Sequence, residues 1–238
     1  MDRGLALITG GAVRVGRAIS IGLANAGYRV VVHANSHFEE AQRLAKKLDG
    51  FAVSGDLSNP KSRTTIFQQV DGFEGRLSLL VNSAAVFRPS APEDVDPTLW
   101  TQHVDVNLSA PFFCAQQAYQ RMRTSGGSII NIVDIAALQP EENFVHYAMT
   151  KAGLLSMTRG LAHHWAPKVR VNGVSPGPVL LPETYTPAER AAWLERLPMG
   201  EALGPKDVAD TVTFLATGPS GITGQVIRVD GGWTSRVS

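Results

Sequence analysis

The chain has 238 residues, a length that one α/β domain can reach, and 44% of them are hydrophobic against 18% charged. Its formal net charge of +1 favours neither a nucleic-acid-binding surface nor an acidic interaction tail. The single cysteine, Cys114, excludes an internal disulfide and agrees with a reducing, cytoplasmic environment. Because the first apolar run is short and no later stretch is long enough to span a bilayer, we expect neither a signal peptide nor membrane association.

Short apolar runs, many of them β-branched, alternate with longer segments of helical length along the chain. This alternation predicts one α/β domain with a Rossmann-type, doubly wound parallel sheet and helices on both faces. The runs predicted as buried strands are Leu5–Thr9, Tyr28–His33, Phe51–Val53, Leu79–Val81, Ser128–Val133, Val169–Val174 and Val226–Val229. The segments predicted as helices are Arg14–Ala26, Phe38–Lys47, Lys61–Val70, Thr98–Arg123, Asn143–Trp165 and Lys206–Ala216.

One irregular, proline-rich segment interrupts this alternation late in the chain, over residues 176–198. A long insertion of this kind in an α/β domain is typical of a lid over a binding site. We therefore expect residues 176–198 to form a loop that borders the substrate.

The first predicted strand runs into Thr9–Gly16, a turn of mostly small residues that leads into a predicted helix. Small residues let the backbone approach a pyrophosphate, and the helix N-terminus offers free amides and a positive dipole end. A purely structural turn would look alike, so the motif alone leaves both interpretations open. Further motifs then fall in order along the chain, most of them at strand ends: Asp56-Leu57, Asn82-Ser83-Ala84, Asn107, Tyr147, Lys151, Ser175-Pro176-Gly177 and Asp230-Gly231-Gly232.

In order and spacing these motifs resemble the short-chain dehydrogenase/reductase family over nearly the whole chain. The resemblance implies an oxidoreductase in which residues 1–238 form a single dinucleotide-binding and catalytic domain. Arg14 stands where the usual motif has its middle glycine, and this departure is similar to the pteridine reductase branch of the family. The cofactor-binding residues implied by the resemblance are Gly10, Arg14, Val15, Gly16, His33, Asn35, Ser36, Asp56, Leu57, Asn82, Ser83, Ala84, Tyr147, Lys151, Pro176 and Gly177.

The end of the second predicted strand carries no carboxylate before Glu39. An NAD-specific site usually places Asp or Glu there to bind the ribose hydroxyls. Without that charge, Arg14 and Ser36 can hydrogen-bond a 2′-phosphate, so we expect NADPH to be preferred over NADH. The alternative for Arg14 is a solvated surface arginine.

Tyr147 and Lys151 are four residues apart and therefore share one face of a predicted helix. A free tyrosine has a pKa of about 10, and a nearby ammonium lowers it. We expect Tyr147 to donate the proton in the reductive direction. The resemblance implies that Lys151 also holds the nicotinamide ribose and that Asn107 binds a water leading to Lys151.

Asp134 lies thirteen residues before Tyr147, where the family usually has a serine and the pteridine reductases have an aspartate. An ionised carboxylate would repel the negative charge that grows on a ketone oxygen, but it would stabilise a protonated imine. The exchange therefore predicts reduction of a ring imine of the dihydropterin type. The alternative for Asp134 is a helix N-cap.

In the pteridine reductases an aromatic residue beyond the fourth strand stacks on the pterin. The matching position is Val86, and Phe87 follows one residue later, so either is a candidate substrate contact. A general carbonyl or 3-oxoacyl-thioester reductase remains the alternative function. A cofactor-binding regulator without catalysis is a third reading, which the intact set of Tyr147, Lys151 and Asn107 disfavours. The histidine spacings match no recognised ligand set, so we expect no metal site.

The predicted helices Thr98–Arg123 and Asn143–Trp165 correspond to those that pair in tetramers of the family. We therefore expect a homotetramer, with a dimer as the fallback. The residues expected to be buried between the subunits are Phe112, Phe113, Leu154 or Leu155, and Met157.

Overall fold

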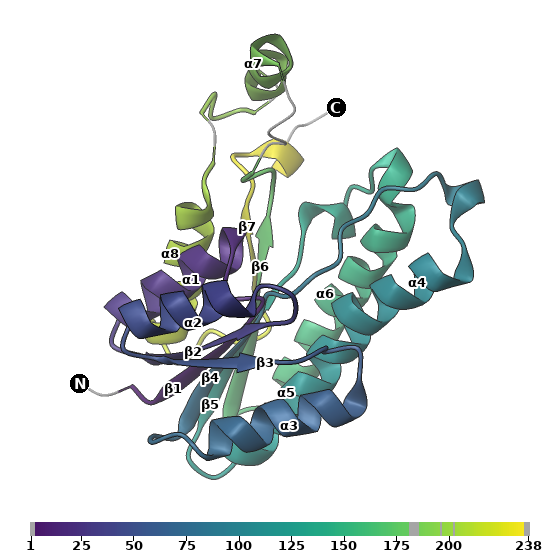
Figure 1. Cartoon of the computed structure of the whole chain (residues 1–238). Coiled ribbons are helices and arrows are strands. Elements are labelled where there is room, and N and C mark those ends of the chain that lie inside the picture. Colours follow the sequence, from purple (N-terminus) through teal and green to yellow (C-terminus); the bar gives the residue numbers. More distant parts are fainter. Residues whose placement is uncertain (1–2, 181–185, 196, 202, 236–238) are drawn as a thin grey trace.

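The computed structural model describes residues 3–180, 186–195, 197–201 and 203–235 (Figure 1). Within them, seven parallel strands form one sheet in the order β3-β2-β1-β4-β5-β6-β7. The chain therefore winds outward from β1 in one direction and then, from β4, in the other, which confirms the predicted doubly wound fold. The strands are β1 (Leu5–Thr9), β2 (Arg29–Ala34), β3 (Phe51–Ser54), β4 (Leu77–Asn82), β5 (Gly127–Ile132), β6 (Val169–Pro176) and β7 (Val226–Val229).

Helices pack on both faces of the sheet, so the central strands are buried on two sides, while the edge strands β3 and β7 are only partly buried. In β1, for example, Ile8 belongs to one apolar core and Leu7 to the other. The helices of the first face are α1 (Arg14–Asn25), α2 (Phe38–Lys47) and α8 (Pro205–Thr217). The helices of the second face are α3 (Pro60–Asp71), α5 (Ala110–Met122) and α6 (Val145–Trp165).

The single helix predicted over Thr98–Arg123 is divided. It consists of α4 (Pro97–Val104), a π-helical turn over Asp105–Ser109, and α5. Pro111 explains the break, because it has no N–H to donate to the carbonyl of Asn107 and a regular α-helix cannot continue there. The other predicted element bounds differ from the structure by at most two residues, as at α6, which follows a 3-10 turn over Glu142–Phe144.

The expected loop over residues 176–198 lies partly outside the described residues, at 181–185 and 196. Its described part contains α7 (Pro187–Glu195), which stands beyond the carboxyl ends of β6 and β7 (Figure 1). Just after it, Leu197 is buried, and the N–H of Met199 donates to the carbonyl of Gly231 at 3.2 Å. The role of this segment as a lid stays a prediction. In the described part of the chain, no helix has the length and hydropathy that a membrane crossing requires.

Candidate active site

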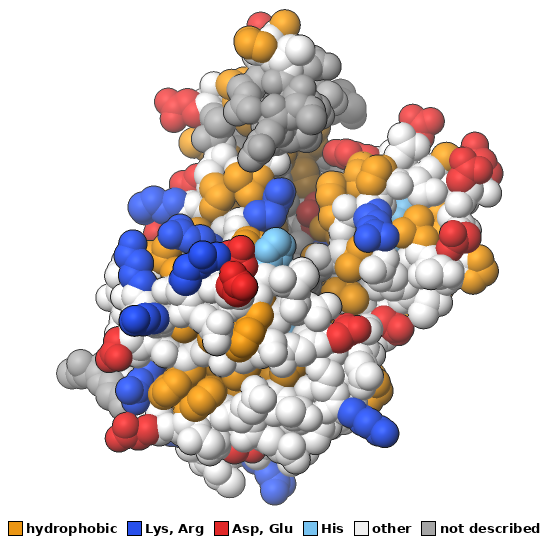
Figure 2. Space-filling view, viewed as in Figure 1, with side chains coloured by type: hydrophobic (Ala, Val, Ile, Leu, Met, Phe, Trp, Pro, Cys, Tyr) orange, Lys and Arg blue, Asp and Glu red, His pale blue; other side chains and the backbone are white. Residues whose placement is uncertain are grey.

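A cavity of about 1150 Å³ lies at the carboxyl edge of the sheet, where α/β folds of this kind bind their ligands. The surface is hollowed between the part that carries α1 and α2 and the part that carries α4 (Figure 2). Among the residues predicted for cofactor, catalysis and substrate, only Asn82 and Asn107 do not line this cavity. The topology thus brings together motifs that are far apart in the sequence.

Two glycines shape the turn between β1 and α1. A Cβ on Gly10, whose φ is +63°, would lie 2.9 Å from the Cα of Ala84, and one on Gly16 would lie 2.0 Å from the carbonyl oxygen of Gly10. The turn can therefore close against the loop after β4 only without these side chains. This leaves the N-terminus of α1 facing the cavity, as a pyrophosphate requires.

Arg14 occupies an unusual place in this turn. It is exposed, lines the cavity and has a φ of +51°, in the left-handed region that non-glycine residues rarely adopt. The backbone is therefore strained at the position where the family commonly has glycine.

His33, predicted as a cofactor contact, ties the turn to the neighbouring strands. Its Nδ1 accepts from the N–H of Gly10 at 3.2 Å, and its Nε2 lies 2.9 Å from the carbonyl oxygen of Gly55, to which it donates. Burial lowers the pKa of His33, which keeps the ring neutral in this tautomer. His33 therefore lines the cavity and also holds the glycine turn in place.

The wall after β2 carries Asn35, Ser36 and His37 and no carboxylate. The first two were predicted, whereas His37 was not, because only the fold shows that the chain still follows the cavity there. On the adjacent wall, Oδ1 of Asp56 accepts from the N–H and the hydroxyl of Ser58, both at 2.8 Å. A region of neutral donors near Arg14 fits a ribose that carries a 2′-phosphate.

Asn82 lies behind the wall rather than in it. Its Nδ2 donates to Oδ1 of Asn131 at 2.9 Å, and Nδ2 of Asn131 donates to the hydroxyl of Thr158 at 2.9 Å. Nearby, the hydroxyl of Thr9 accepts from the N–H groups of Ser83 and Ala84. This buried network braces the strand ends, so Asn82 supports the cavity wall and does not line it.

The catalytic candidates meet at the end of β5. The hydroxyl of Tyr147 donates to Oδ2 of Asp134 at 2.9 Å, while Oδ1 of Asp134 accepts from the N–H of Ala136 at 2.9 Å. Nζ of Lys151 donates to the carbonyl of Ile132 at 2.9 Å. Asp134 therefore caps a short 3-10 turn with one carboxylate oxygen and accepts from the catalytic candidate Tyr147 with the other. The N-cap interpretation and the active-site interpretation are thus compatible.

The ionisation of this group differs from the prediction. Burial raises the pKa of Tyr147 well above its ordinary value, and the charge and hydrogen bond of Asp134 act in the same direction. Burial also lowers the pKa of Lys151 to about 8, which the charge of Asp134 opposes. The expectation that Lys151 lowers the pKa of Tyr147 is therefore wrong here, because the carboxylate is the nearer partner. Tyr147 keeps its proton and shares it with Asp134.

Asp134 itself is shifted toward the protonated form. Burial raises the pKa of its carboxyl, against the opposing effects of the Ala136 N–H, Lys151 and Tyr147. A carboxyl and a phenol joined by one hydrogen bond at the cavity wall can therefore hold a proton and pass it on.

The segment after β4 presents an aromatic ring to the cavity. Both polar atoms of the Asn107 amide hold Val86: Oδ1 accepts from its N–H at 2.7 Å, and Nδ2 donates to its carbonyl at 2.9 Å. The water expected between Asn107 and Lys151 stays a prediction. Phe87 is 58% exposed, stacks on Phe144 at 4.2 Å between ring centroids, and meets the Tyr147 ring edge-on at 4.8 Å. Of the two substrate candidates, Val86 and Phe87, only Phe87 has an aromatic ring, and this ring contacts Tyr147.

Further residues line the cavity that the sequence did not single out. Some lie on α4 and the π-helical turn, where the sequence predicts a helix but does not indicate that one of its faces borders a binding site. The others lie beside the predicted motifs. The unpredicted lining residues are Ala34, His37, Ser58, Pro97, Thr98, Thr101, Gln102, Asp105, Val106, Ile132 and Val133. The lining residues Ala12, Val13, Ala85, Pro178, Val179 and Leu180 belong to the predicted motifs or to the loop expected to border the substrate. Among the described residues, no group of three or more His, Cys, Asp or Glu side chains could hold a metal ion.

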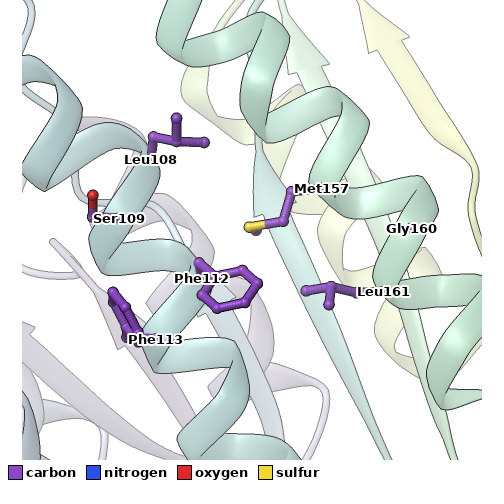
Figure 3. Close-up of a pocket in the computed structure, with 7 residues that line it drawn as sticks. All are labelled: Leu108, Ser109, Phe112, Phe113, Met157, Gly160 and Leu161. Carbon is purple, nitrogen blue, oxygen red and sulfur yellow. The ribbon is translucent and has the colours of Figure 1, made fainter.

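A second, apolar cavity of about 470 Å³ lies between α5 and α6 (Figure 3). Its walls include Phe112 and Phe113, which are 40% and 42% exposed, and Met157. Leu154, one of the residues expected between subunits, is instead 1% exposed within the subunit's own core. Cys114, next to this face, is buried, and burial raises its pKa to about 12, so it is a core residue rather than a nucleophile.

The chain matches the family model described as enoyl-(acyl carrier protein) reductase over residues 11–234. It is 30% identical over 237 residues to the 3-oxoacyl-(acyl-carrier-protein) reductase FabG of Staphylococcus aureus strain Mu50, covering 95% of this chain and 96% of that protein. It is 35% identical over 242 residues to the L-rhamnose-1-dehydrogenase of Scheffersomyces stipitis, covering 94% and 93%.

A crystal structure described as a short-chain alcohol dehydrogenase from Sinorhizobium meliloti 1021 superposes with a TM-score of 0.90 at 31% identity, covering 100% of this chain and 98% of that one. These similarities do not single out the pteridine reductase branch. The matched model, the relatives and the shared fold show that the chain belongs to the short-chain dehydrogenase/reductase family of oxidoreductases.

Proposed function

We propose that the chain is an NADPH-dependent reductase that adds hydride to a ring imine of the dihydropterin type. The observation that carries the proposal is the hydrogen bond from Tyr147 to Asp134, at 2.9 Å in the wall of the cavity. Asp134 takes the place of the serine hydroxyl that usually donates to a ketone oxygen in this family.

The chemistry of this pair suits a C=N bond better than a C=O bond. When NADPH is bound, it supplies the hydride that adds to the imine carbon, and the imine nitrogen must then gain a proton. Tyr147 holds its proton, and the raised pKa of Asp134 lets that carboxyl carry a proton to the imine nitrogen. The carboxylate left on Asp134 then stabilises the protonated imine, whereas the same carboxylate would repel the charge that develops on a ketone oxygen. The exposed ring of Phe87 offers a flat substrate a stacking surface.

The choice of NADPH rests on the opposite end of the cavity. Arg14 and Ser36 are exposed there, and the wall after β2 carries no acid that would repel a 2′-phosphate. The guanidinium can make charge-assisted hydrogen bonds to that phosphate. In this proposal Lys151, which is buried at the catalytic end, holds the nicotinamide ribose.

A second candidate is a carbonyl or 3-oxoacyl-thioester reductase. The names of the relatives above favour it over the first candidate, because one is a 3-oxoacyl reductase and another a sugar dehydrogenase. In this reaction a protonated Asp134 would donate a hydrogen bond to the substrate oxygen, which its raised pKa makes easier.

The two candidates separate in a substrate panel. Purified wild type is given NADPH or NADH with dihydrobiopterin, dihydrofolate, a 3-oxoacyl thioester and a simple activated ketone, and kcat/KM is measured for each pair. The proposal expects the highest values for the dihydropterins with NADPH. Efficient reduction of the ketone or thioester with no turnover of any dihydropterin would establish the second candidate instead.

We also propose that the apolar face of α5 and α6 is covered in a homotetramer, or a dimer built on the same face. Phe112, Phe113 and Met157 leave an apolar hollow on this face. Burying it removes apolar surface from water. Light scattering at micromolar concentration is expected to give four subunits, and Phe112→Asp to lower that number, whereas a monomeric wild type would contradict the proposal.

A further inference from the structure

The backbone on both sides of Phe87 is held by buried side chains. Before it, Asn107 binds both the N–H and the carbonyl of Val86. After it, the N–H of Arg88 donates to Nε2 of His103 at 3.4 Å, and the carbonyl of Arg88 accepts from Nε2 of His146 at 3.0 Å. Each residue next to Phe87 is therefore held at its backbone N–H and at its backbone carbonyl.

The two histidines must take opposite tautomers to do this. His103 presents a lone pair at Nε2, so its proton lies on Nδ1, which donates to the carbonyl of Leu99 at 2.9 Å. His146 presents an N–H at Nε2, and its buried Nδ1 has no hydrogen-bond partner among the described residues, as a deprotonated nitrogen allows. The rings are 0% and 3% exposed and meet edge to face, with centroids 4.5 Å apart.

We propose that His103 and His146 are positioning residues. Together they clamp the backbone N–H and carbonyl of Arg88 and so set the position of the Phe87 ring in the active-site cavity. Neither histidine lines that cavity, so they act through Phe87 and not on the substrate. The inference rests on the proposed function, in which Phe87 forms one wall of the substrate site.

The clamp joins the segment after β4 to the helix that carries the catalytic tyrosine. His146 directly precedes Tyr147 on α6, while His103 comes from α4. The position of the Phe87 ring relative to Tyr147 thus depends on the hydrogen bonds from His103 and His146 to the backbone of Arg88. A displacement of the ring relative to Tyr147 would misplace the substrate, and errors of about 1 Å can cost 100-fold in rate.

Protonation should open the clamp. The titratable and charged groups that face His103 are His146 and Tyr147 from α6 and Arg88 from the segment itself. A proton on Nε2 of His103 would point at the N–H of Arg88, so two donors would face each other. Burial lowers the pKa of His103, so the closed clamp is favoured near neutral pH and is lost as the pH falls below the ordinary histidine value of about 6.5.

Matched variants at each histidine test the clamp. Glutamine places an amide group near the position of Nε2 and can reach Arg88, whereas the shorter asparagine can replace Nδ1 only. His103→Gln and His146→Gln are expected to retain the clamp, and His103→Asn and His146→Asn to open it. Two quantities are measured with NADPH bound: hydrogen–deuterium exchange of the peptide covering residues 84–91, and kcat and KM for the best substrate of the panel.

The asparagine variants are expected to exchange faster over residues 84–91 and to raise the substrate KM about tenfold, the size expected from one lost hydrogen bond, with NADPH affinity within about twofold of wild type. The glutamine variants should resemble wild type in both measurements. Wild-type exchange in the asparagine variants, or equal losses in the glutamine and asparagine variants, would overturn the clamp. Because exchange needs no substrate, a wild type inactive on every dihydropterin would defeat the proposed function and still leave the clamp tested.

Discussion

The two ends of the cavity are held in different ways. At the cofactor end, Gly10 and Gly16 fix the shape because no Cβ fits between backbone groups. At the chemical end, Tyr147, Asp134 and Lys151 fix it through buried hydrogen bonds whose strength depends on where the protons are. We therefore expect added side-chain atoms to disrupt the cofactor end, and the removal or displacement of protons to disrupt the chemical end.

Tyr147→Phe should have the largest effect on turnover. The variant keeps the ring and removes the hydroxyl that donates to Asp134. General acid catalysis typically contributes about 10²–10⁴-fold in rate, so we expect kcat to fall by that factor while NADPH binding is kept. Steady-state kinetics and NADPH fluorescence measure the two quantities. Nearly normal turnover would mean that the proton comes from another group, with Asp134 the first to examine.

Gly16→Ala should damage the cofactor end through one added methyl group. Its Cβ would lie 2.0 Å from the carbonyl oxygen of Gly10, so the turn must shift. Overpacking of this kind costs about 1–3 kcal/mol, and we expect the free energy of unfolding to fall by that amount and the NADPH dissociation constant to rise more than tenfold. Gly221→Ala is the matched control, because nothing lies within 4 Å of its added Cβ. If the two variants behave alike, the turn is not fixed by close backbone contact.

Arg14→Gly should change stability and cofactor binding in opposite directions. Glycine adopts the left-handed conformation at φ +51° without the strain that a side chain causes. We therefore expect the free energy of unfolding to rise by about 1 kcal/mol. The loss of charge-assisted hydrogen bonds should raise the KM for NADPH about tenfold and leave that for NADH nearly unchanged. Arg17→Ala, on the same helix but outside the cavity lining, controls for the loss of charge. A variant that keeps full NADPH preference would make Arg14 a solvated surface residue.

The pH dependence should report on Lys151. Its pKa is lowered to about 8, so its ammonium is lost as the pH rises through that value, and kcat/KM should fall there. Because the charge of Asp134 raises the pKa of Lys151, Asp134→Asn should move this fall, the alkaline limb of the pH profile of kcat/KM, to lower pH. The same shift has a consequence for stability. The unfolded chain binds more protons between about 8 and the ordinary lysine value, so this group's contribution to the free energy of unfolding rises with pH in that window. A limb that does not move in Asp134→Asn would exclude Lys151 as its source.

The sequence was sufficient to predict the sheet and the glycine turn, because these follow from local patterns and strand ends. The family resemblance was needed to select Asp134 beside Tyr147 and Lys151. The π-helical turn before α5 was missed, although Pro111 carries its signal. The direction of the Tyr147 pKa shift could not be read from spacing, since it depends on burial and on the carboxylate being the nearer partner.

Other features exist only in the folded chain. The clamp of His103 and His146 joins two helices to a segment that is distant in the sequence, and the single residue Arg88 connects them. For the subunit contact, the resemblance left Leu154 and Leu155 as alternatives. The structure buries Leu154 in the core of the subunit and leaves Leu155 half-buried. A helical pattern gives the presence of an apolar face without saying what covers it.

We expect Asp134 to make the site selective for a C=N bond. The ratio of kcat/KM for dihydrobiopterin to that for an activated ketone, measured in wild type and in Asp134→Ser, tests this selectivity. The ratio should exceed one in wild type and fall at least about tenfold in the variant, through loss of the pterin reaction. An unchanged ratio, or a wild type that reduces the ketone well and does not reduce the pterin, would show that Asp134 does not select for a C=N bond.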